Sequence, residues 1–355
     1  MAEQTTQDKR PSPEALLEQA SLETRGHLKV FLGAAPGVGK TYEILLSAAA
    51  LRRAGTDVVI GLVETHGRRE TEALVKGFEI VPRKRLDYKA RAHDEMDLDA
   101  ILERAPQLVL VDELAHSNEP GSRHPKRYMD VEDLLAAGID VYTTVNIQHL
   151  ESLNDVVAQI THIRVRETVP DAFIDRADEI EVIDLTPGDL IQRLKEGKVY
   201  VPNTAERALT HYFSPGNLTA LRELALRRTA QRVDQQLLTH MQAHAISGPW
   251  TAGDRLLVVV NEHPKALSLV RHARRMAERL RAPWTALYVE TPHALRLTEA
   301  ERDRIADALR LAEKLGGQAV TIPGSELAKE IMDYAGTNNF SHVVIGKSQR
   351  SRLHE

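Results

Sequence analysis

The chain has no cysteine among its 355 residues. This absence excludes disulfide bonds, thiol catalysis and cysteine-based zinc sites, and it fits a reducing compartment. Aromatic residues make up only 4% of the sequence, which argues against a surface built to stack nucleic-acid bases. No apolar run approaches the roughly 18 residues that a membrane-spanning helix needs. The polar start, Met1–Glu14, lacks the apolar core of a signal peptide, so we expect a soluble cytoplasmic chain.

The formal net charge of −5 is mild, and it predicts no general attraction to nucleic acid or to a membrane surface. Hydrophobic residues (42%) and charged residues (27%) occur in the proportions of a globular protein. A chain of 355 residues is long enough for two domains. We expect a flexible tail over residues 1–24, a first domain over 25–245, a linker over 246–253 and a second domain over 254–355.

Short runs of valine, isoleucine and leucine alternate with helical patterns in the first domain. This alternation predicts an α/β fold with a parallel sheet that is covered on both faces. Functional groups of such sheets gather at the carboxyl ends of the strands. The expected strands are 28–32, 57–63, 108–111 and 140–145, and two of the helices expected between them are 42–54 and 131–137.

A glycine-rich stretch, GAAPGVGKTYE at Gly33–Glu43, follows the first expected strand and leads into a helix. The usual phosphate-loop pattern is G-x-x-x-x-G-K-[ST]. Counting back from Gly39, the first glycine of the pattern should stand at position 34, but that residue is Ala34 and the glycine is Gly33. The order of strand, loop and helix still predicts a phosphate loop, whose backbone N–H groups surround phosphate oxygens. The alternative is a strand-to-helix turn that binds nothing.

Four residues are predicted to carry the chemistry at this loop. Lys40 would neutralise the β- and γ-phosphates of a nucleotide, and the Thr41 hydroxyl would bind Mg²⁺. Asp112 follows four apolar strand residues, as an Mg²⁺-binding aspartate of a Walker B segment does. Glu113 beside it is a candidate to orient or deprotonate a nucleophile. The alternatives are a helix N-cap or surface position for Asp112 and a plain surface position for Glu113.

Further polar residues follow the other strands. Glu64, His66 and Arg68 come after the second strand and are either site residues or satisfied loop residues. The basic loop 117–127 is either a phosphate or acidic-partner contact or a solvated loop. No histidine spacing matches a metal site, so the only expected metal is nucleotide-bound Mg²⁺ at Thr41 and Asp112. The residues expected to contact the nucleotide are Gly33, Ala34, Ala35, Pro36, Gly37, Val38, Gly39, Lys40, Thr41, Tyr42, Asn146 and Gln148.

Beyond the first sheet, Asn217 is expected to cap a long helix that runs toward Ala243. A second series of strands and helices then predicts a smaller α/β domain, which stops just after its fourth strand and so looks truncated. Its expected strands are 255–260, 284–289, 318–322 and 342–346, and its expected helices are 265–281, 298–315 and 325–336.

Long segments of the first domain resemble the N-terminal cytoplasmic domain of the KdpD family, the potassium-responsive sensor histidine kinases of bacteria. The matching segments cover most of residues 26–232. Among them, DELAHSNEPGSRHPKR is far more specific than a phosphate loop. The segments are GVGKTYE, DELAHSNEPGSRHPKR, VETHGR, TTVNIQHLESLNDVV, RETVPD, RLKEGKVYVPNTAERAL and GNLTALRELALRRTA. The offset of Gly33 and Ala34 also resembles the loop of that family, so the resemblance implies an atypical Walker A site for ATP and Mg²⁺.

The resemblance implies a cytoplasmic region of an inner-membrane protein in a two-component system. Its partners would be the potassium-uptake ATPase and, through a kinase core beyond residue 355, a response regulator. Independently of the resemblance, the long helix from Asn217 is a candidate contact for a homodimer. The second domain resembles the universal-stress-protein domain of the same family. ATP-binding members of that superfamily carry further glycines where this chain has Gly346-Lys-Ser-Gln349. Some members of the KdpD family bind cyclic di-AMP through a serine-rich segment where this chain has Asn261-Glu-His-Pro264. Both departures argue against a nucleotide, cyclic di-AMP included, in the second domain.

Three functions remain open. In the first, ATP bound at Lys40, Thr41 and Asp112 shifts the region between two conformations and so regulates the kinase core. In the second, which the resemblance implies, the domain is a serine kinase acting on the potassium pump, with Glu113 or Asp112 orienting the acceptor. The third and weakest is a plain nucleotide triphosphatase.

Overall fold

The computed structural model describes residues 25–88, 91–197, 199, 212–243, 253–280 and 282–346. The chain divides into two compact units, Met1–Ala230 (unit 1) and Gln231–Glu355 (unit 2), and the division falls inside a long helix. The expected tail 1–24, most of the expected linker (246–252) and Lys347–Gln349 lie outside the described residues.

Unit 1 is built on a six-stranded sheet with the strand order β3-β2-β6-β7-β1-β8. Every neighbouring pair in it is parallel, which confirms the predicted α/β class. One strand, β7, separates β1 from β6, so the strand that enters the glycine loop does not touch the strand that ends in Asp112. The strands are β1 Leu28–Gly33, β2 Val58–Leu62, β3 Glu79–Ile80, β6 Leu108–Val111, β7 Asp140–Asn146 and β8 Glu179–Ile183.

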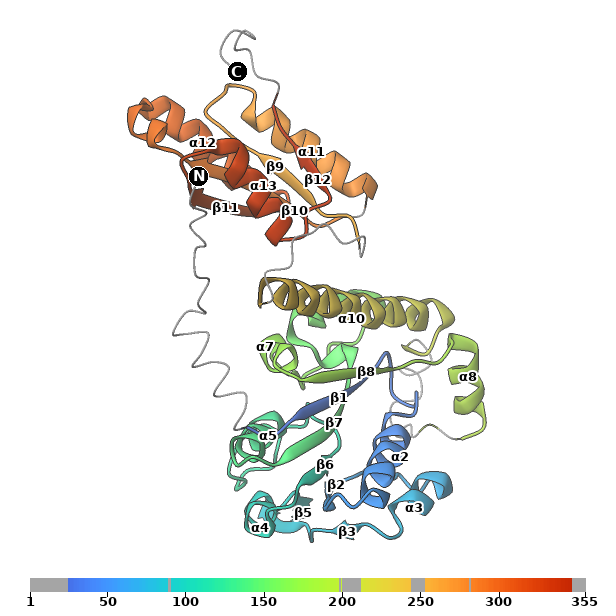
Figure 1. Ribbon diagram of the computed structural model, residues 1–355. Coiled ribbons are helices and arrows are strands. Elements are labelled where there is room, and N and C mark those ends of the chain that lie inside the picture. The colour runs from blue at the N-terminus through green and yellow to red at the C-terminus, as the bar shows by residue number, and fades with distance from the viewer. Residues whose placement is uncertain are drawn as a thin grey trace. The chain divides into compact units, whose positions relative to one another are not determined.

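Helices lie on both faces of this sheet, with α2 on one side and α5 on the other (Figure 1). Two of them differ in their starts from the prediction: α2 begins at Lys40 rather than at residue 42, and α5 begins at Arg127 rather than at residue 131. The helices are α2 Lys40–Arg53, α3 Arg69–Val75, α4 Leu98–Arg104, α5 Arg127–Ala136, α6 Asn154–Thr161, α7 Asp171–Asp175, α8 Pro187–Lys195 and α10 Pro215–Ala243, with short 3-10 turns η1 Ile147–His149 and η2 Glu151–Leu153.

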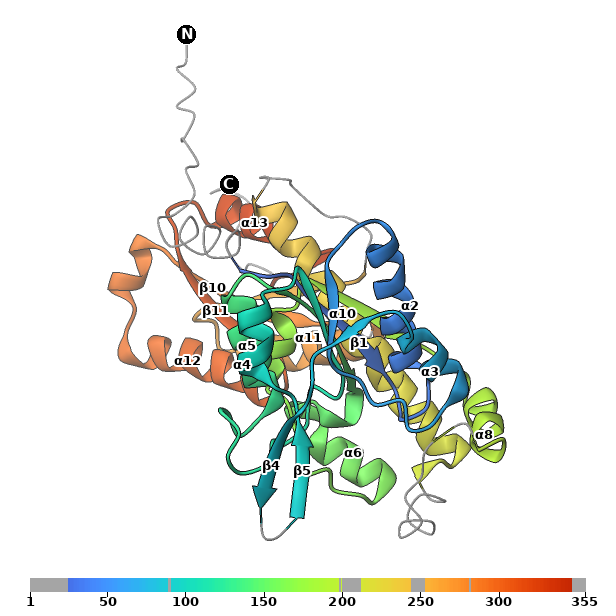
Figure 2. The same ribbon diagram turned by 90° about the horizontal axis from the view of Figure 1, so that it is seen from below.

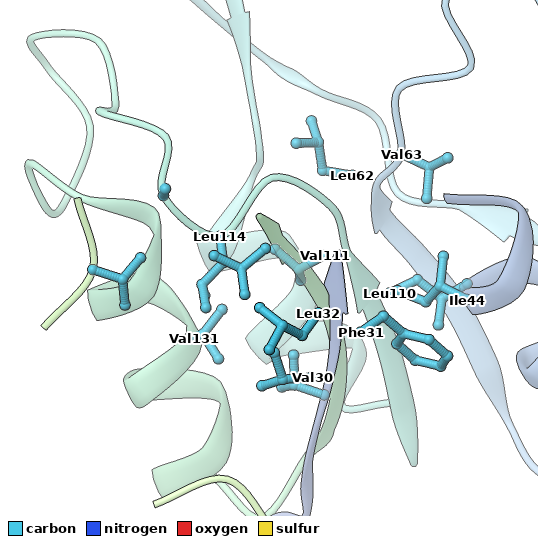
Figure 3. Packing of buried hydrophobic residues seen from close by; sticks show 14 of the residues in the cluster. Val30, Phe31, Leu32, Ile44, Leu62, Val63, Leu110, Val111, Leu114 and Val131 are labelled. Atoms are coloured by element: carbon cyan, nitrogen blue, oxygen red, sulfur yellow. The ribbon is translucent and has the colours of Figure 1, made fainter. Parts of the chain in front are cut away.

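The core of unit 1 follows from the alternation of side chains along its central strands. Successive residues of a strand point to opposite faces, so Phe31 lies on the side of Ile44 from α2, while Val30 and Leu32 lie on the side of Val131 from α5 (Figure 3). All five side chains are 0–1% exposed. Because both faces of the sheet are closed in this way, only the ends of its strands remain for polar chemistry.

Four strands of unit 1 were not predicted. The edge strand β8 reads Glu-Ile-Glu-Val-Ile. Because glutamates alternate with its apolar residues, it has no continuous apolar run that would indicate a buried strand. Lys29 of β1 forms ion pairs with Glu179 and Glu181 of that strand, at 2.7 and 2.9 Å. The two-residue edge strand β3 and the antiparallel hairpin of β4 (Lys84–Tyr88) and β5 (Arg91–Glu95) also lack an apolar run, and Figure 2 shows this hairpin projecting from the sheet.

The start of the long helix α10 corrects one prediction. The helix begins at Pro215, so Asn217 lies in its first turn and is not its N-cap. The cap is Ser214, whose hydroxyl accepts a hydrogen bond from the Asn217 N–H at 3.3 Å and whose carbonyl accepts one from Leu218 at 3.0 Å. Proline suits the first helical position because it has no N–H to satisfy there, which explains why the helix starts earlier than expected.

Unit 2 has a four-stranded parallel sheet with the order β11-β10-β9-β12, as its pattern predicted. Buried side chains of α11 and α12 cover one face and those of α13 cover the other. Across the described residues, no helix is both long and apolar enough to cross a membrane. The elements are β9 Leu256–Val259, α11 Ala266–Leu280, β10 Trp284–Glu290, η4 Pro292–Arg296, α12 Glu299–Lys314, β11 Gln318–Pro323, α13 Leu327–Thr337 and β12 His342–Val344.

Candidate functional site

The carboxyl ends of β1, β6 and β7 bring four of the predicted site residues together. The Lys40 Nζ donates a hydrogen bond to Asn146 Oδ1 at 2.5 Å. The hydroxyl of Thr41 donates to Asp112 Oδ2 at 3.0 Å. Residues that are up to 106 positions apart in the sequence thus form one polar cluster at the glycine loop.

The early glycine of the loop has a steric cause. Gly33 is the last residue of β1, and a Cβ atom there would lie 2.7 Å from Val38 Cγ2 and 3.0 Å from Lys40 Cδ. Such distances require a neighbour to move, so Gly33 makes room for the stem of Lys40. The side chains of Ala34 and Ala35 are 7% and 0% exposed, which shows that a methyl group fits at position 34.

Two other glycines set the backbone of the loop. Gly37 and Gly39 have φ angles of 89° and 111°, in the left-handed region that favours glycine. Gly39 is the N-cap residue of α2, so the loop delivers its backbone directly to the positive end of that helix. Val199 covers Gly37 closely: a Cβ atom at Gly37 would lie 2.5 Å from Val199 Cγ2.

Asp112 is the buried centre of the cluster, with 2% exposure. Its Oδ1 accepts hydrogen bonds from the Thr144 hydroxyl and from the Glu113 N–H, the latter at 3.0 Å. Its Oδ2 accepts from Thr41 and, at 3.5 Å, from the Glu64 N–H. No helix begins here, because the residues after Asp112 form a turn, so the N-cap and surface alternatives for this residue are wrong.

Glu113 points away from the core and its side chain is 48% exposed. Its φ angle of 55° is uncommon for a residue with a side chain, and such conformations often occur at functional sites. Loss of water in its recess and the nearby charge of Asp112 raise the pKa of its carboxyl, against the smaller effects of Arg127 and His66. A carboxyl with a raised pKa is better suited to take up a proton than an ordinary glutamate.

The Glu113 carboxyl lies on the wall of a cavity of about 230 Å³. Three imidazole–carboxylate pairs line it: His116 and Glu95 at 2.9 Å, His93 and Glu119 at 3.2 Å, and His66 and Glu113 at 3.9 Å. In the described part of the chain, no group of these side chains has the arrangement of a metal site. The cavity is lined by Leu62, Glu64, His66, His93, Asp94, Glu95, Glu113, His116, Glu119 and Arg127.

Arg127 is buried, contrary to the alternative of a fully solvated basic loop at 117–127. It is 3% exposed, and its Nη2 contacts Glu95 Oε2 at 3.2 Å. Its Nη1 donates to the carbonyl oxygens of Asp112 and Glu113, each at 3.3 Å, so it fixes the backbone that carries both carboxylates. Burial would raise the pKa of Glu95, but the hydrogen bond with His116, the bond from the Glu119 N–H and the charges of His116 and Arg127 outweigh it and lower that pKa to about 2.

Gln148 and Tyr42, two of the predicted nucleotide contacts, lie in different surroundings. Gln148 accepts a hydrogen bond from the Tyr212 hydroxyl, and its Nε2 donates to His149 Nε2 at 3.3 Å, so the protein already satisfies its amide. Tyr42 lies on α2 and is 39% exposed. The sequence did not single out Arg193 of α8, whose Nη1 donates to the Val38 carbonyl at 3.5 Å. The one feature of the sequence that points to Arg193 is its place in RLKEGKVYVPNTAERAL, a segment that resembles the family.

Comparison with known proteins now bears on this site. Residues 24–233 match the family model "KdpD: Osmosensitive K+ channel His kinase sensor domain". The chain belongs to the KdpD sensor-domain family. The matched region covers the glycine loop, Asp112 and the start of α10, and it ends close to the boundary between the two units.

Named relatives agree with this membership. The sensor protein KdpD of Escherichia coli is 52% identical over 97% of this chain, and the putative sensor protein KdpD of Synechocystis is 43% identical over 93% of it. The chain spans 38% of the length of the E. coli protein and 88% of the Synechocystis protein. A universal stress protein from Archaeoglobus fulgidus matches 28% of this chain and 80% of its own at 19% identity, with a TM-score of 0.23.

Replacing Gly33 with alanine should destabilise unit 1 by about 1–3 kcal/mol, because the new methyl group overlaps Val38 and Lys40. Urea unfolding followed by far-UV circular dichroism measures this change. The matched control is Gly216→Ala in α10, where a Cβ atom meets nothing within 4 Å, and which should stabilise by about 0.5–1 kcal/mol. Equal midpoints for the two variants would contradict the steric account of Gly33.

Replacing Arg127 with alanine should cost about 3–5 kcal/mol, because it leaves Glu95 buried without its cation. Arg123→Ala is the control, since its pairs with Asp99 and Asp133 are exposed and should be worth at most about 1 kcal/mol. Both tryptophans of the chain lie within residues 231–355, so circular dichroism should report the loss while tryptophan fluorescence still reports unit 2. A midpoint shift for Arg127→Ala no larger than that of the control would show that the buried pair is not needed.

Proposed function

We propose that unit 1 binds ATP with Mg²⁺ at Lys40, Thr41 and Asp112 and regulates a KdpD sensor kinase of the two-component system that controls the potassium-uptake ATPase. The observation that carries the proposal is the hydrogen-bonded cluster of Lys40, Asn146, Thr41 and Asp112 at the end of the glycine loop. The residue types are those that hold a nucleotide phosphate and its metal.

The electrostatics of Lys40 support an anionic ligand. Burial, with a smaller effect from the charge of Arg68, lowers the pKa of its amine to about 8, although Asp112 and Glu113 act in the opposite direction. Among the described residues, the hydrogen-bond acceptor of its amine is the neutral amide of Asn146. A polyphosphate would supply the missing negative charge, and the Lys40 amine would then hold the β- and γ-phosphates.

Thr41 and Asp112 fit the role of an Mg²⁺ pair. Their oxygens already lie 3.0 Å apart, and carboxylate and hydroxyl oxygens are the ligands that Mg²⁺ prefers. When bound, the ion would neutralise charge on the phosphates. The protein's part is to orient these two oxygens and, through Gly37, Val38 and Gly39, to present backbone N–H groups to the nucleotide.

Asn146 gives the site a route to regulation. It ends β7, between the strand of the glycine loop and the strand of Asp112 and Glu113. A phosphate that took Lys40 away from Asn146 would change the partner of a strand-end residue in the middle of the sheet. A ligand regulates only if it binds two conformations with different affinity, and this exchange of partners is a physical basis for such a difference.

The alternative function is phosphoryl transfer to a serine of the potassium pump, with Lys40, Asp112 and Glu113 as the catalytic residues. The observation that favours it is the raised pKa of Glu113 at the wall of an open cavity next to Asp112. Plain hydrolysis of ATP is a weaker alternative that would use the same residues. A homodimer through α10, which exposes Leu226 and Val233, and a response regulator engaged through a kinase core are further proposals that rest on the relatives.

Removing the amine of Lys40 should abolish nucleotide binding. We expect Lys40→Ala to raise the Kd for Mg-ATP by about 100-fold or more in a calorimetric titration, because it removes charged contacts to two phosphates. Its thermal stability without nucleotide should not fall, since the variant loses a poorly compensated cation. An unchanged Kd would show that the glycine loop is not the nucleotide site.

The same titration with Glu113→Gln separates the two functions. This variant should bind Mg-ATP as the wild type does, because Glu113 is expected to contact the reacting water or hydroxyl rather than the nucleotide. If γ-labelled ATP transfers label to the purified pump with the wild type and not with Glu113→Gln, the kinase function is supported. Binding without any transfer by the wild type supports the regulatory function alone.

Nucleotide affinity should fall as the pH rises above about 8, since the amine of Lys40 then loses its proton in the free protein. Bound phosphate favours the charged amine, so binding takes up a proton and the Kd for Mg-ATP should rise about tenfold per pH unit between pH 8 and 9.5. Lys40→Arg is the control, because its guanidinium keeps its charge throughout this range. A Kd that does not change with pH in the wild type would show that Lys40 does not titrate at the site.

A further inference from the structure

Three cations gather at the glycine loop of unit 1 from three different elements. Lys40 begins α2, Arg68 is the N-cap residue of α3 after β2, and Arg193 belongs to the last turn of α8. Lys40 and Arg68 interact electrostatically with each other, and so do Arg68 and Arg193, in both cases with repulsion. The carboxylate of Asp112 offsets part of this repulsion, and a bound anion would offset more of it.

Arg193 reaches the loop from outside the strand–loop–helix unit. Its Nη1 donates to the Val38 carbonyl at 3.5 Å, which is at the limit of a hydrogen bond. The same atom would lie 3.4 Å from a Cβ atom on Gly39. The guanidinium therefore lies against the backbone that leads into the N-terminus of α2, where a phosphate loop holds the α- and β-phosphates.

Arg68 comes from the other side of the sheet's centre, because it follows β2, whereas α8 follows the edge strand β8. It follows β2 in the segment Val63–Arg68 and is half-buried. Burial lowers the pKa of its guanidinium, Asp112 opposes this change, and Arg193 adds to it. Its electrostatic partners Lys40 and Asp112 are the residues that would hold the terminal phosphate and Mg²⁺.

Arg68 and Arg193 differ from several other arginines of unit 1 in their ion pairs. Elsewhere in unit 1, Arg104 pairs with Asp57 at 2.9 Å and Arg222 pairs with Asp184 at 2.6 Å. Within the described ranges, Arg68 and Arg193 form no ion pair with a carboxylate. Two guanidinium groups that face one site and form no such ion pair fit a ligand with several negative oxygens, since each can contact phosphate with two parallel N–H groups.

We propose that Arg68 and Arg193 are phosphate-binding residues that clamp the nucleotide from opposite sides of the glycine loop. Arg193 contacts the phosphates that ADP and ATP share, and Arg68 contacts the terminal phosphate that only ATP carries. The clamp rests on the proposed nucleotide site and adds a way to distinguish ATP from ADP. It supplies from within the chain the positive charge that some nucleotide-binding proteins receive from a partner.

The test is calorimetric titration of the whole chain with Mg-ATP and with Mg-ADP. Loss of one charged contact should change affinity by about 10- to 100-fold. Arg68→Ala should therefore weaken Mg-ATP by that factor and Mg-ADP by less than about threefold. Arg193→Ala should weaken both nucleotides to a similar extent. Arg69→Ala and Lys195→Ala are matched controls, because these exposed cations neighbour the two arginines and should leave both affinities unchanged.

The outcomes separate the clamp from the nucleotide site itself. If Lys40→Ala loses binding while both arginine variants bind both nucleotides as the wild type does, the clamp is wrong and the nucleotide site stands. If Arg68→Ala weakens ATP and ADP equally, the assignment of Arg68 to the terminal phosphate is wrong. If Lys40→Ala binds normally, the site itself is wrong. Arg68→Gln and Arg193→Gln keep polar side chains of similar length and replace any alanine variant whose circular dichroism shows misfolding.

Discussion

The buried carboxylate of Asp112 is the interaction on which the site of unit 1 depends. It accepts hydrogen bonds from Thr41 at the start of α2, from Thr144 in β7, from the Glu113 N–H and, more weakly, from Glu64 after β2. A buried carboxylate is stable only when such donors surround it. Meeting that requirement fixes the ends of three strands and one helix relative to one another, and the glycine loop is held in place by the same bonds.

Charge on the two sides of Asp112 is balanced in different ways. On the side of the cavity, Arg127 and Glu95 neutralise each other in the interior, and each histidine of the wall lies beside a glutamate. On the side of the loop, Lys40 has a neutral amide as its hydrogen-bond partner, and the cations near it repel it or one another. The ion pairs on the side of the cavity are thus complete, whereas on the side of the loop Asp112 and Glu113 only partly offset the burial of Lys40 and the charge of Arg68. This asymmetry is why we favour an anionic ligand at the loop, and why the cavity is better suited to an acceptor or to water than to a second phosphate.

Family membership gives this asymmetry a biological setting. The chain spans 38% of the length of the E. coli relative, so the output of a nucleotide signal would appear in parts of such proteins that lie outside this stretch. The matched region ends at residue 233, within α10, a continuous helix that runs from Pro215 to Ala243 through the boundary of the two units.

Local pattern was sufficient for much of this protein. The apolar runs of β1, β2, β6 and β7 identify the central strands because both faces of the sheet are buried, and GVGKT followed by a helix identifies the loop. Tertiary structure decided the rest. The edge strand β8 and the hairpin of β4 and β5 are too charged to be recognised without their neighbours, and Ser214 rather than Asn217 caps α10. The reason for Gly33 lies in the stem of Lys40, and the place of Arg193 beside the loop depends on contacts across 155 residues. The sequence indicates the chemical role of a residue when that role depends on its neighbours in the chain. Contacts between residues far apart in the chain form only when folding of the sheet brings the ends of its strands together.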